Sequence, residues 1–519
     1  MKLTLKFLLA LLIAANFTAC SKDDSDPETP PEVEVEVEPT LEADPTEIAT
    51  FIWEGLETYY LWVNDVPALN LKEDSEEWKE TLNAYGTDYE SLFNSFLYLT
   101  NAQGEEVDRW SWIVDDYVTQ EEAFSGVSKS FGFEFRLSKY SNSDGVFGYV
   151  TYVLPDSPAS NTVLKRGDIF VSVDGTDLDI SNYSDLLFSK DSYTLGLADY
   201  TSTGIANNGT EVSITAEEGY EENPILLTKT IDNGGQKVGY LVYNSFIGTD
   251  KFNLALNDSI AKLKDAGVKE MVLDLRYNGG GSLYTDQLLC SMLTGSHTGE
   301  LLFESKYNDF LSQYYVENYG ENALKDFFVD KIKGDKGTEL ATINSLNLQR
   351  LFVLTSGSTA SASEQLINGL RPYIDVVLIG TTTHGKYTSS ITVYDYIDNN
   401  GTKNPDHTWA MQPIVGKVAN SIGDSDFGSG FTTDYTRNEW DYLGSIKPLG
   451  DTEEPYLAAA LGIIAGESVP VELQAKTKAA SGLQKLKELF NSKDIKQFSK
   501  ELVDDTHNRK MLNLNDIVK

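Results

Sequence analysis

A serine-rich stretch, GSTASASEQLINGL at residues 357–370, joins a short apolar run to a sequence that favours a helix. Ser and Thr at such a junction commonly cap the helix by accepting hydrogen bonds from its first backbone amides. The same position also suits a nucleophilic hydroxyl, because the amides and the helix dipole can stabilise a negative charge there. The stretch by itself leaves both interpretations open.

Glycine-bearing turns follow two further apolar runs and could supply backbone amides to the same site. MVLDLR precedes YNGGGS at residues 277–282, and VVLIG precedes TTTHGK, which ends at Lys386. The carboxyl ends of strands form the usual site in open α/β sheets, and glycines there let N–H groups point into a cleft. Phosphate binding is disfavoured, because no Walker lysine follows and GGGS lacks the dinucleotide spacing.

The motifs LVYNSF, DLRYNGGGS, TASASE and IGTTTHGK occur in this order, behind a β-rich segment. In that order they resemble the C-terminal processing peptidases, also called tail-specific proteases, over residues 120–465. The resemblance implies a serine peptidase that acts on polypeptides. It also fits the alternation of strand and helix patterns after residue 237, which favours an α/β core.

The resemblance implies a role for individual residues. Ser361 is expected to be the nucleophile and Lys386 the general base, with an oxyanion hole formed by the amide of Gly281 or Gly280 and that of Ala362. A hydroxyl is a weak nucleophile and needs a neighbouring base. A lysine serves as that base only when neutral, so burial must lower its pKa.

The sequence departs from the family at one position. Many members carry a Gln four residues after the lysine to orient its amine, whereas this chain has Ser390 there. We expect the Ser390 hydroxyl to take that role with a shorter reach. His384, two residues before Lys386, stays open as an alternative base. The missing Gln also leaves open a catalytically inactive lipoprotein that binds peptides or glycans.

The segment before the peptidase motifs resembles a PDZ domain of the bacterial protease type. FGFEFRL, VFGYVTYVL and the later RGDIFVSVDG carry this resemblance. It implies that the backbone amides of Gly132, Phe133, Glu134 and Phe135 bind the C-terminal carboxylate of a polypeptide substrate. An extended peptide can add as a strand beside such a loop.

The first twenty residues have the layout of a targeting segment. Lys2 and Lys6 precede an apolar core that is too short to span a bilayer, and small residues follow before Cys20. FTAC resembles a bacterial lipobox, which implies lipidation of Cys20. The expected location is therefore the outer membrane, on its periplasmic or cell-surface face, with the lipid as the membrane contact.

Composition limits the remaining classes. A formal charge of −39 over 519 residues excludes a nucleic-acid partner, which requires a basic face. The four His and two Cys disfavour a structural zinc site, and we expect neither a metal nor a cofactor. Cys290 lies in an apolar helical pattern and is expected to be a buried thiol.

These patterns predict a multidomain α/β protein. The expected segments are a signal peptide (1–19), a lipidated Cys with an acidic tether (20–43), a helical N-terminal domain (44–117), a β-rich PDZ-like domain (118–235), an α/β serine peptidase domain (236–466) and a helical C-terminal appendage (467–519).

Overall fold

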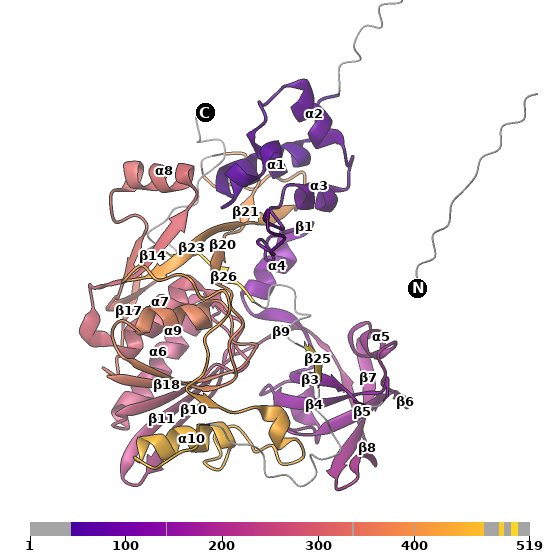
Figure 1. Ribbon diagram of the computed structural model, residues 1–519, viewed down its shortest axis with the longest axis vertical. Helices are drawn as coiled ribbons and strands as arrows, with labels where there is room; N and C mark the ends of the chain where they lie inside the picture. The colour runs from indigo at the N-terminus through magenta and orange to yellow at the C-terminus, as the bar shows by residue number, and fades with distance from the viewer. Residues whose placement is uncertain are drawn as a thin grey trace, which may run out of the picture. The chain divides into compact units, whose positions relative to one another are not determined.

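The computed structural model describes residues 43–141, 143–334, 337–398, 400–471, 487–492 and 500–506 (Figure 1). The predicted signal peptide, Cys20 and most of the acidic tether lie outside these residues. Among the described helices, none has the length and apolar character that a membrane crossing requires.

The first described region is mainly helical, as its sequence predicts. It contains α1 (Glu47–Tyr59), α2 (Glu76–Asn83) and α3 (Tyr89–Ser95). Phe51, Ile52 and Leu56 recur on one face of α1 and pack into a buried aromatic-rich cluster with residues of α2 and α3. The chain then enters β1 (Trp112–Val114), which pairs with β22 (Ala410–Gln412); β22 in turn pairs with β21 (Val393–Tyr394).

A β-rich region follows. Its main sheet has the strand order β25-β3-β4-β5-β7-β8, with β6 (Thr176–Asp177) beside β5. The strand bounds are β25 (Lys487–Asn491), β3 (Phe133–Lys139), β4 (Val146–Val153), β5 (Ile169–Val173), β7 (Ser192–Thr201) and β8 (Gly204–Thr215). The Tyr- and Gly-rich residues near 190–210 form the β7–β8 hairpin, and α5 (Tyr183–Phe188) precedes it.

The α/β core is built on a second sheet, with the order β10-β11-β12-β18-β19-β24. All neighbouring pairs from β11 onward are parallel, and β10 is antiparallel to β11. The strand bounds are β10 (Ile225–Asn233), β11 (Gln236–Tyr243), β12 (Glu270–Asp274), β18 (Arg350–Thr355), β19 (Asp375–Gly380) and β24 (Tyr435–Thr436).

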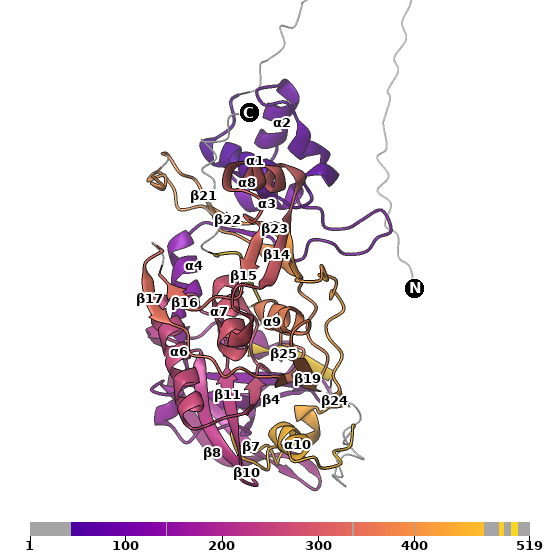
Figure 2. The ribbon, with the colours of Figure 1, turned by 90° about the vertical axis from the view of Figure 1, so that its left-hand side faces the viewer.

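Helices cover both faces of this core sheet, because successive strand residues point to opposite sides. Leu273 and Val353 face a cluster that includes α6 (Asp250–Asp265), α7 (Leu283–Leu293) and α9 (Ala362–Leu370). Val272 and Phe352 face α10 (Pro455–Ile464) on the other side (Figures 1 and 2). The predicted α/β core is therefore confirmed.

A third sheet has the order β13-β26-β20-β23-β14-β15. Its strands are β13 (Gly281–Ser282), β26 (Leu502–Val503), β20 (Thr388–Ser390), β23 (Ile414–Asn420), β14 (Leu301–Tyr307) and β15 (Lys325–Phe327). The remaining elements are α4 (Tyr117–Phe124), α8 (Asp309–Tyr319), β2 (Val127–Ser130), β9 (Glu217–Glu221), β16 (Lys331–Lys333) and β17 (Glu339–Thr342).

The described part of the last segment differs from the helical appendage predicted for 467–519. Residues 487–491 and 502–503 are the strands β25 and β26, and they join two different sheets. Lys and Glu favour a helix only weakly, by tenths of a kcal/mol per residue, so pairing with an available strand edge overrides that preference. Leu502 is fully buried in its strand position.

Candidate active site

Ser361 stands directly before α9, at the turn that follows β18. Its φ of 62° is unusual for a residue other than glycine, and such strained conformations concentrate at functional sites. The side chain is fully buried, yet its Oγ has no hydrogen-bond partner among the described residues. The hydroxyl therefore does not cap the helix, and Ser363 Oγ donates elsewhere, to the Asn278 carbonyl at 3.1 Å.

Glu364 holds the backbones of the predicted nucleophile and base together. Its Oε2 accepts the N–H of Ser361 at 3.1 Å and the N–H of Lys386 at 2.8 Å. Its Oε1 accepts the N–H of Gly385 at 2.7 Å and the hydroxyl of Thr383 at 2.5 Å. Burial raises the pKa of Glu364 to about 7, although these four donors oppose the shift.

Sequence reasoning assigned no role to Glu364, although the residue belongs to TASASE. The Ser-x-x-Glu spacing is the signature of a capping box, in which the Glu side chain accepts the N–H of the first residue. That signal could have indicated the bond to Ser361. Nothing in the sequence indicates the bond to Lys386, because it depends on how two separate loops meet.

The Lys386 side chain is fully buried, and its amine has three neighbours. Nζ donates to the Lys500 carbonyl at 2.7 Å and to Glu501 Oε1 at 2.6 Å, and it lies 5.1 Å from the ring centre of Trp110. Burial lowers the pKa of Lys386, and the carboxylate of Glu501 opposes this. Since Ser361 Oγ has no partner, the amine and the hydroxyl are not hydrogen bonded to each other here.

The Ser390 hydroxyl lies near the Lys386 amine, but the described contacts include no hydrogen bond between the two groups. Ser390 Oγ donates to Glu501 Oε2 at 2.8 Å, so one carboxylate separates the hydroxyl from the amine. Gln412 Nε2 donates to Ser390 Oγ at 3.0 Å, and Gln120 Nε2 donates to Gln412 Oε1 at 3.0 Å. The sequence did not indicate either glutamine, because each comes from a distant element.

His384, the alternative base, packs against Trp110 with the two ring centres 5.2 Å apart. Its backbone N–H donates to the Thr359 carbonyl at 2.9 Å. The ring makes no hydrogen bond to Ser361 Oγ in the described structure. Trp110 therefore touches both candidate bases, and sequence reasoning had not singled it out.

The glycine run lies beside Ser361, where the sequence predicts an oxyanion hole. The N–H of Gly281 donates to the backbone carbonyl of Glu501 at 2.5 Å, whereas the N–H of Gly280 donates to Asn278 Oδ1 at 2.9 Å. A Cβ on Gly280 would lie 2.5 Å from the Glu501 carbonyl oxygen and 2.9 Å from Ser361 Oγ. A peptide carbonyl thus lies beside the predicted nucleophile, on the amide of Gly281 rather than that of Gly280.

Ala362 is the first residue of α9. The first amides of a helix have no partner within the helix, so this N–H is available by its position in the fold. It follows Ser361 directly and belongs to the same turn as the hydroxyl. The two amides predicted for the oxyanion hole, those of Gly281 and Ala362, therefore come from different elements that meet at Ser361.

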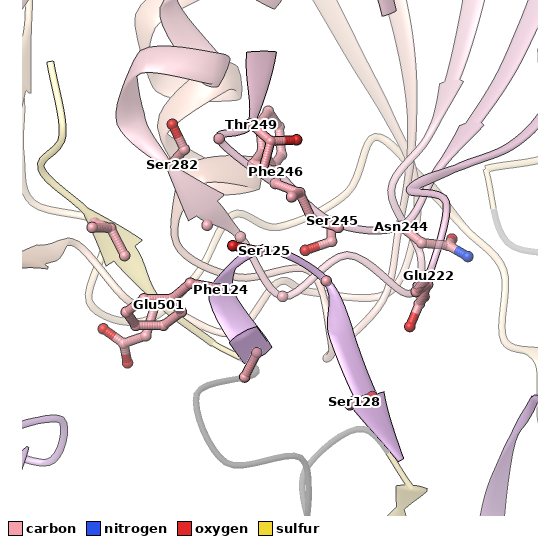
Figure 3. Close-up of a pocket in the computed structure, with 18 of the residues that line it drawn as sticks. Phe124, Ser125, Ser128, Glu222, Asn244, Ser245, Phe246, Thr249, Ser282 and Glu501 are labelled. Atoms are coloured by element: carbon pink, nitrogen blue, oxygen red, sulfur yellow. The ribbon is translucent and has the colours of Figure 1, made fainter. Parts of the chain in front are cut away.

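A cavity of about 760 Å³ opens next to the glycine run. Figure 3 shows Phe124, Ser245, Phe246 and Glu501 around it. Residues of α4, β2, the loop after β11, β13 and the segment around β26 line it, so the β-rich and core regions both contribute. Its size lies within the range of ligand-binding clefts.

The predicted carboxylate-binding loop leads into β3, which lies between β25 and β4 in the β-rich sheet. Gly132 has a φ of 83° and its N–H donates to Ser130 Oγ at 3.0 Å. The side chains of Phe133 and Phe135 are buried in the core of this region. The N–H of Phe135 donates to Ser492 Oγ at 2.8 Å, and that hydroxyl donates to Glu134.

The cysteine and metal expectations have separate outcomes. Cys290 is fully buried and its Sγ donates to Asp286 Oδ1 at 3.3 Å, as expected for a core thiol. Cys20 lies outside the described residues. Within the described ranges, no group of His, Cys, Asp and Glu side chains could hold a metal ion.

Two family descriptions match this chain: residues 237–411 match "Peptidase family S41" and residues 47–112 match "Peptidase S41 N-terminal domain". A chloroplastic C-terminal processing peptidase of Tetradesmus obliquus is 25% identical over 276 residues, covering 50% of this chain and 52% of that protein. A protein of Staphylococcus aureus named as a CtpA-like serine protease is 24% identical over 355 residues, covering 63% of this chain and 60% of its own length. The chain thus spans about half to three-fifths of these curated relatives.

A crystal structure from Bacteroides fragilis, named as an S41 protease, superposes with a TM-score of 0.62. The two sequences are 29% identical, and the match covers 80% of this chain and 97% of that one.

Proposed function

Because the chain belongs to peptidase family S41, we propose that it is a serine endopeptidase that cleaves polypeptides through an acyl-enzyme on Ser361, with Lys386 as general base. One observation carries this proposal above the others. A peptide carbonyl, that of Glu501, accepts the Gly281 amide next to the unpartnered Ser361 hydroxyl. A substrate carbonyl bound in the same place would be polarised for attack.

The proposed reaction has two halves. Ser361 Oγ attacks the substrate carbonyl carbon and Lys386 takes the hydroxyl proton, while the amides of Gly281 and Ala362 stabilise the oxyanion. The C–N bond then breaks and the leaving amine takes the proton from Lys386. Water attacks the acyl-enzyme and gives a proton to Lys386. The ester bond to Ser361 Oγ then breaks, Lys386 returns the proton to that oxygen, and the product leaves with a new carboxylate. Burial of Lys386 supports its role, because burial favours the neutral amine.

Ser390 is proposed to orient the Lys386 amine during this reaction. The support is proximity: the Ser390 hydroxyl and the Lys386 amine contact the two oxygens of one carboxylate, Glu501 Oε2 and Oε1, so the hydroxyl lies near the amine. Gln412 holds the Ser390 hydroxyl from the other side. Ser390→Ala should therefore lower kcat by about one to two orders of magnitude, the scale of one lost hydrogen bond to a charged group. Unchanged kcat would restrict Ser390 to a structural role.

The β-rich region is proposed to recruit the substrate as a PDZ-like module, through Gly132 to Phe135. Strand β25, from a distant part of the chain, pairs with residues 136–139 of β3, which supports β3 as a strand that accepts an added strand. A peptide with a free C-terminal carboxylate should bind the full chain more tightly than its amidated form, because amidation removes the charge that amides would bind. Equal binding of the two forms would exclude C-terminal recognition.

Attachment to the outer membrane through lipidated Cys20 remains a proposal that rests on the signal layout and the lipobox-like FTAC. Cells grown with labelled palmitate should yield a tagged protein, and Cys20→Ser should remove the tag. Cys290→Ser is the matched control and should keep the tag, because that thiol is buried in the core. A wild-type protein recovered without lipid would contradict this.

The decisive experiment for the peptidase is turnover of an unfolded polypeptide by the full chain. Ser361→Ala should abolish turnover. Ser363→Ala, a change of the same size at the second residue of α9, should retain most of it, because that hydroxyl donates to the Asn278 carbonyl. Absence of turnover in the wild type, with peptide binding retained, would favour the inactive binding protein instead.

A further inference from the structure

A strand of the same chain passes through the candidate active site. β26 lies between β13 and β20 and runs parallel to both. On one side the Gly281 N–H donates to the Glu501 carbonyl at 2.5 Å, and on the other the Asp504 N–H donates to the Ser390 carbonyl at 2.9 Å. Residues 500–506, which we name the resident strand, are thus bound as an added strand.

Glu501 occupies both parts of the catalytic apparatus. Its backbone carbonyl takes the Gly281 amide, where the oxyanion of a substrate would form. Its carboxylate accepts the Lys386 amine at 2.6 Å and the Ser390 hydroxyl at 2.8 Å. The carboxylate raises the pKa of the Lys386 amine against the lowering effect of burial, so this contact disfavours the neutral amine that must take the Ser361 proton. Residue 501 thus occupies the cleft as a bound peptide would, while its carboxylate holds the amine that cleavage requires.

The two aspartates after β26 have partners of their own. Asp504 accepts the hydroxyl of Tyr307, and Asp505 Oδ1 accepts the backbone N–H of Tyr284 at 3.0 Å. Tyr284 lies in the first turn of α7, where the helix dipole favours a negative charge. Leu502, just before them, is fully buried. One apolar and two acidic side chains therefore each have a specific site.

The resident strand also has an upstream attachment. β25 pairs with β3 in antiparallel register, from Lys487 opposite Lys139 to Asn491 opposite Arg136. The Asn491 amide donates to Ser358 Oγ at 2.7 Å, in the loop that leads to Ser361. The same part of the chain therefore contacts the β-rich region, the nucleophile loop and the cleft.

We infer that the resident strand is a built-in ligand of the cleft, which a polypeptide substrate must displace. The cleft accordingly prefers substrates with two acidic residues at the second and third positions after a buried apolar residue. The inference rests on the proposed peptidase function and names what its cleft binds. When only a fraction of molecules has an open cleft, the apparent affinity for substrate falls by that fraction.

The first test loosens the resident strand without changing the cleft. In the full chain, Asp504→Asn together with Asp505→Asn removes two charged contacts and should lower the KM for an unfolded polypeptide by about tenfold or more, a scale set by hydrogen bonds to charged groups. The change should appear in KM rather than kcat. Asp375→Asn, an exposed residue at the opposite, N-terminal end of β19, is the control and should leave KM unchanged.

The second test measures binding without catalysis. A fluorescent peptide with the sequence of residues 500–506, KELVDDT, is titrated into full-length Ser361→Ala protein with and without the two Asp→Asn changes. The loosened protein should bind it about tenfold more tightly, and a peptide with Asn at both Asp positions should bind more weakly. Equal affinities for the two proteins, with unchanged KM in the active enzyme, would overturn the inference.

The two readouts separate this inference from the proposed function. If the labelled peptide binds the loosened protein but no variant cleaves a polypeptide, the resident strand is a ligand and the peptidase proposal fails. If polypeptides are cleaved with the same KM and the peptide does not bind, the peptidase proposal stands and the ligand role fails.

Discussion

The backbone N–H groups of Ser361 and Lys386 donate to one and the same oxygen, Oε2 of Glu364, at 3.1 and 2.8 Å. The proposed nucleophile and the proposed base belong to different loops, and both backbones are held by this shared acceptor. A carboxylate suits the position because it only accepts hydrogen bonds and offers lone pairs to several donors at once. We therefore propose Glu364 as a positioning residue, which acts through the two groups that would meet the substrate.

Glu364→Gln should lower kcat by about ten- to a hundredfold, with a smaller change in KM. A glutamine keeps one acceptor oxygen and places an NH₂ group against N–H donors, so part of the four-donor arrangement is lost. Thr383→Val is the matched control, because it removes only one of the four donors and should lower kcat less than Glu364→Gln does. Steady-state kinetics measure both; a fully active Glu364→Gln protein would exclude the positioning role.

Glu364 should also make folding stability depend on pH. Burial raises its pKa from an ordinary 4.5 to about 7, so ionisation costs more in the folded protein than in the unfolded chain. The stabilising contribution of Glu364 to the free energy of unfolding is therefore complete below about pH 4.5 and is lost as the pH rises through about 7. Between about pH 5 and pH 8, wild type should lose on the order of 3 kcal/mol more unfolding free energy than Glu364→Gln. Urea titrations at both pH values test this; equal losses would contradict it.

Kinetics on two variants can show whether the general base is Lys386 or His384. Lys386→Ala should reduce turnover by about a thousandfold or more, the scale of a lost general base, whereas His384→Ala should be impaired but measurable. The structural reason is that the Lys386 amine is buried, while the His384 ring packs on the same Trp110 at a half-buried position. Parallel kinetics on the two variants decide the matter, and the opposite order would identify the histidine as the base.

The acid limb of the pH–rate profile should follow the titration of the Lys386 amine. Activity is expected to rise with pH, because the amine must lose its proton before it can accept one. Burial lowers its pKa, Glu501 and Asp108 raise it, and Lys500 lowers it further. Glu501→Gln removes the larger opposing charge, so the limb of kcat/KM should move to lower pH. Asp375→Asn again serves as control, and a limb that does not move would exclude Glu501 as the partner that keeps the amine charged.

Gly280→Ala should remove activity by filling the place of the substrate carbonyl. The added methyl would lie 2.5 Å from the Glu501 carbonyl oxygen and 2.6 Å from Ser361 Cβ. Gly267→Ala is the control: that glycine also has a positive φ, but its Cβ would meet nothing within 4 Å. Both changes carry backbone strain of about 1 kcal/mol or more, and only Gly280→Ala should abolish turnover. An active Gly280→Ala protein would show that the substrate carbonyl binds elsewhere.

Gly281 is a poorer position for that test. A Cβ there would lie 2.2 Å from the backbone oxygen of Phe246, so any side chain would distort the strand before it reached the cleft. Loss of activity in such a variant would not distinguish a blocked oxyanion site from a misfolded one.

Local patterns in the sequence determined the residues of the chemistry and the elements that carry them. An apolar run, a glycine or serine turn and a helix form a short-range unit, so the strands before Gly281 and Ser361 and the helix that begins at Ala362 could be predicted from neighbouring residues alone. Burial of Cys290 followed in the same way from its apolar helical surroundings. These features need only the few residues on either side.

Only the tertiary structure decided what surrounds those residues. Glu364 reaches Lys386, Gln412 reaches Ser390, and Trp110 touches both candidate bases, each across a long stretch of chain. Residues 500–506 show the difference most clearly. Their Lys- and Glu-rich neighbourhood predicts a helix, yet Leu502 and Val503 form β26 because β13 and β20 offer strand edges on its two sides. Helix propensity is a local preference of tenths of a kcal/mol per residue, and backbone pairing with distant strands outweighs it.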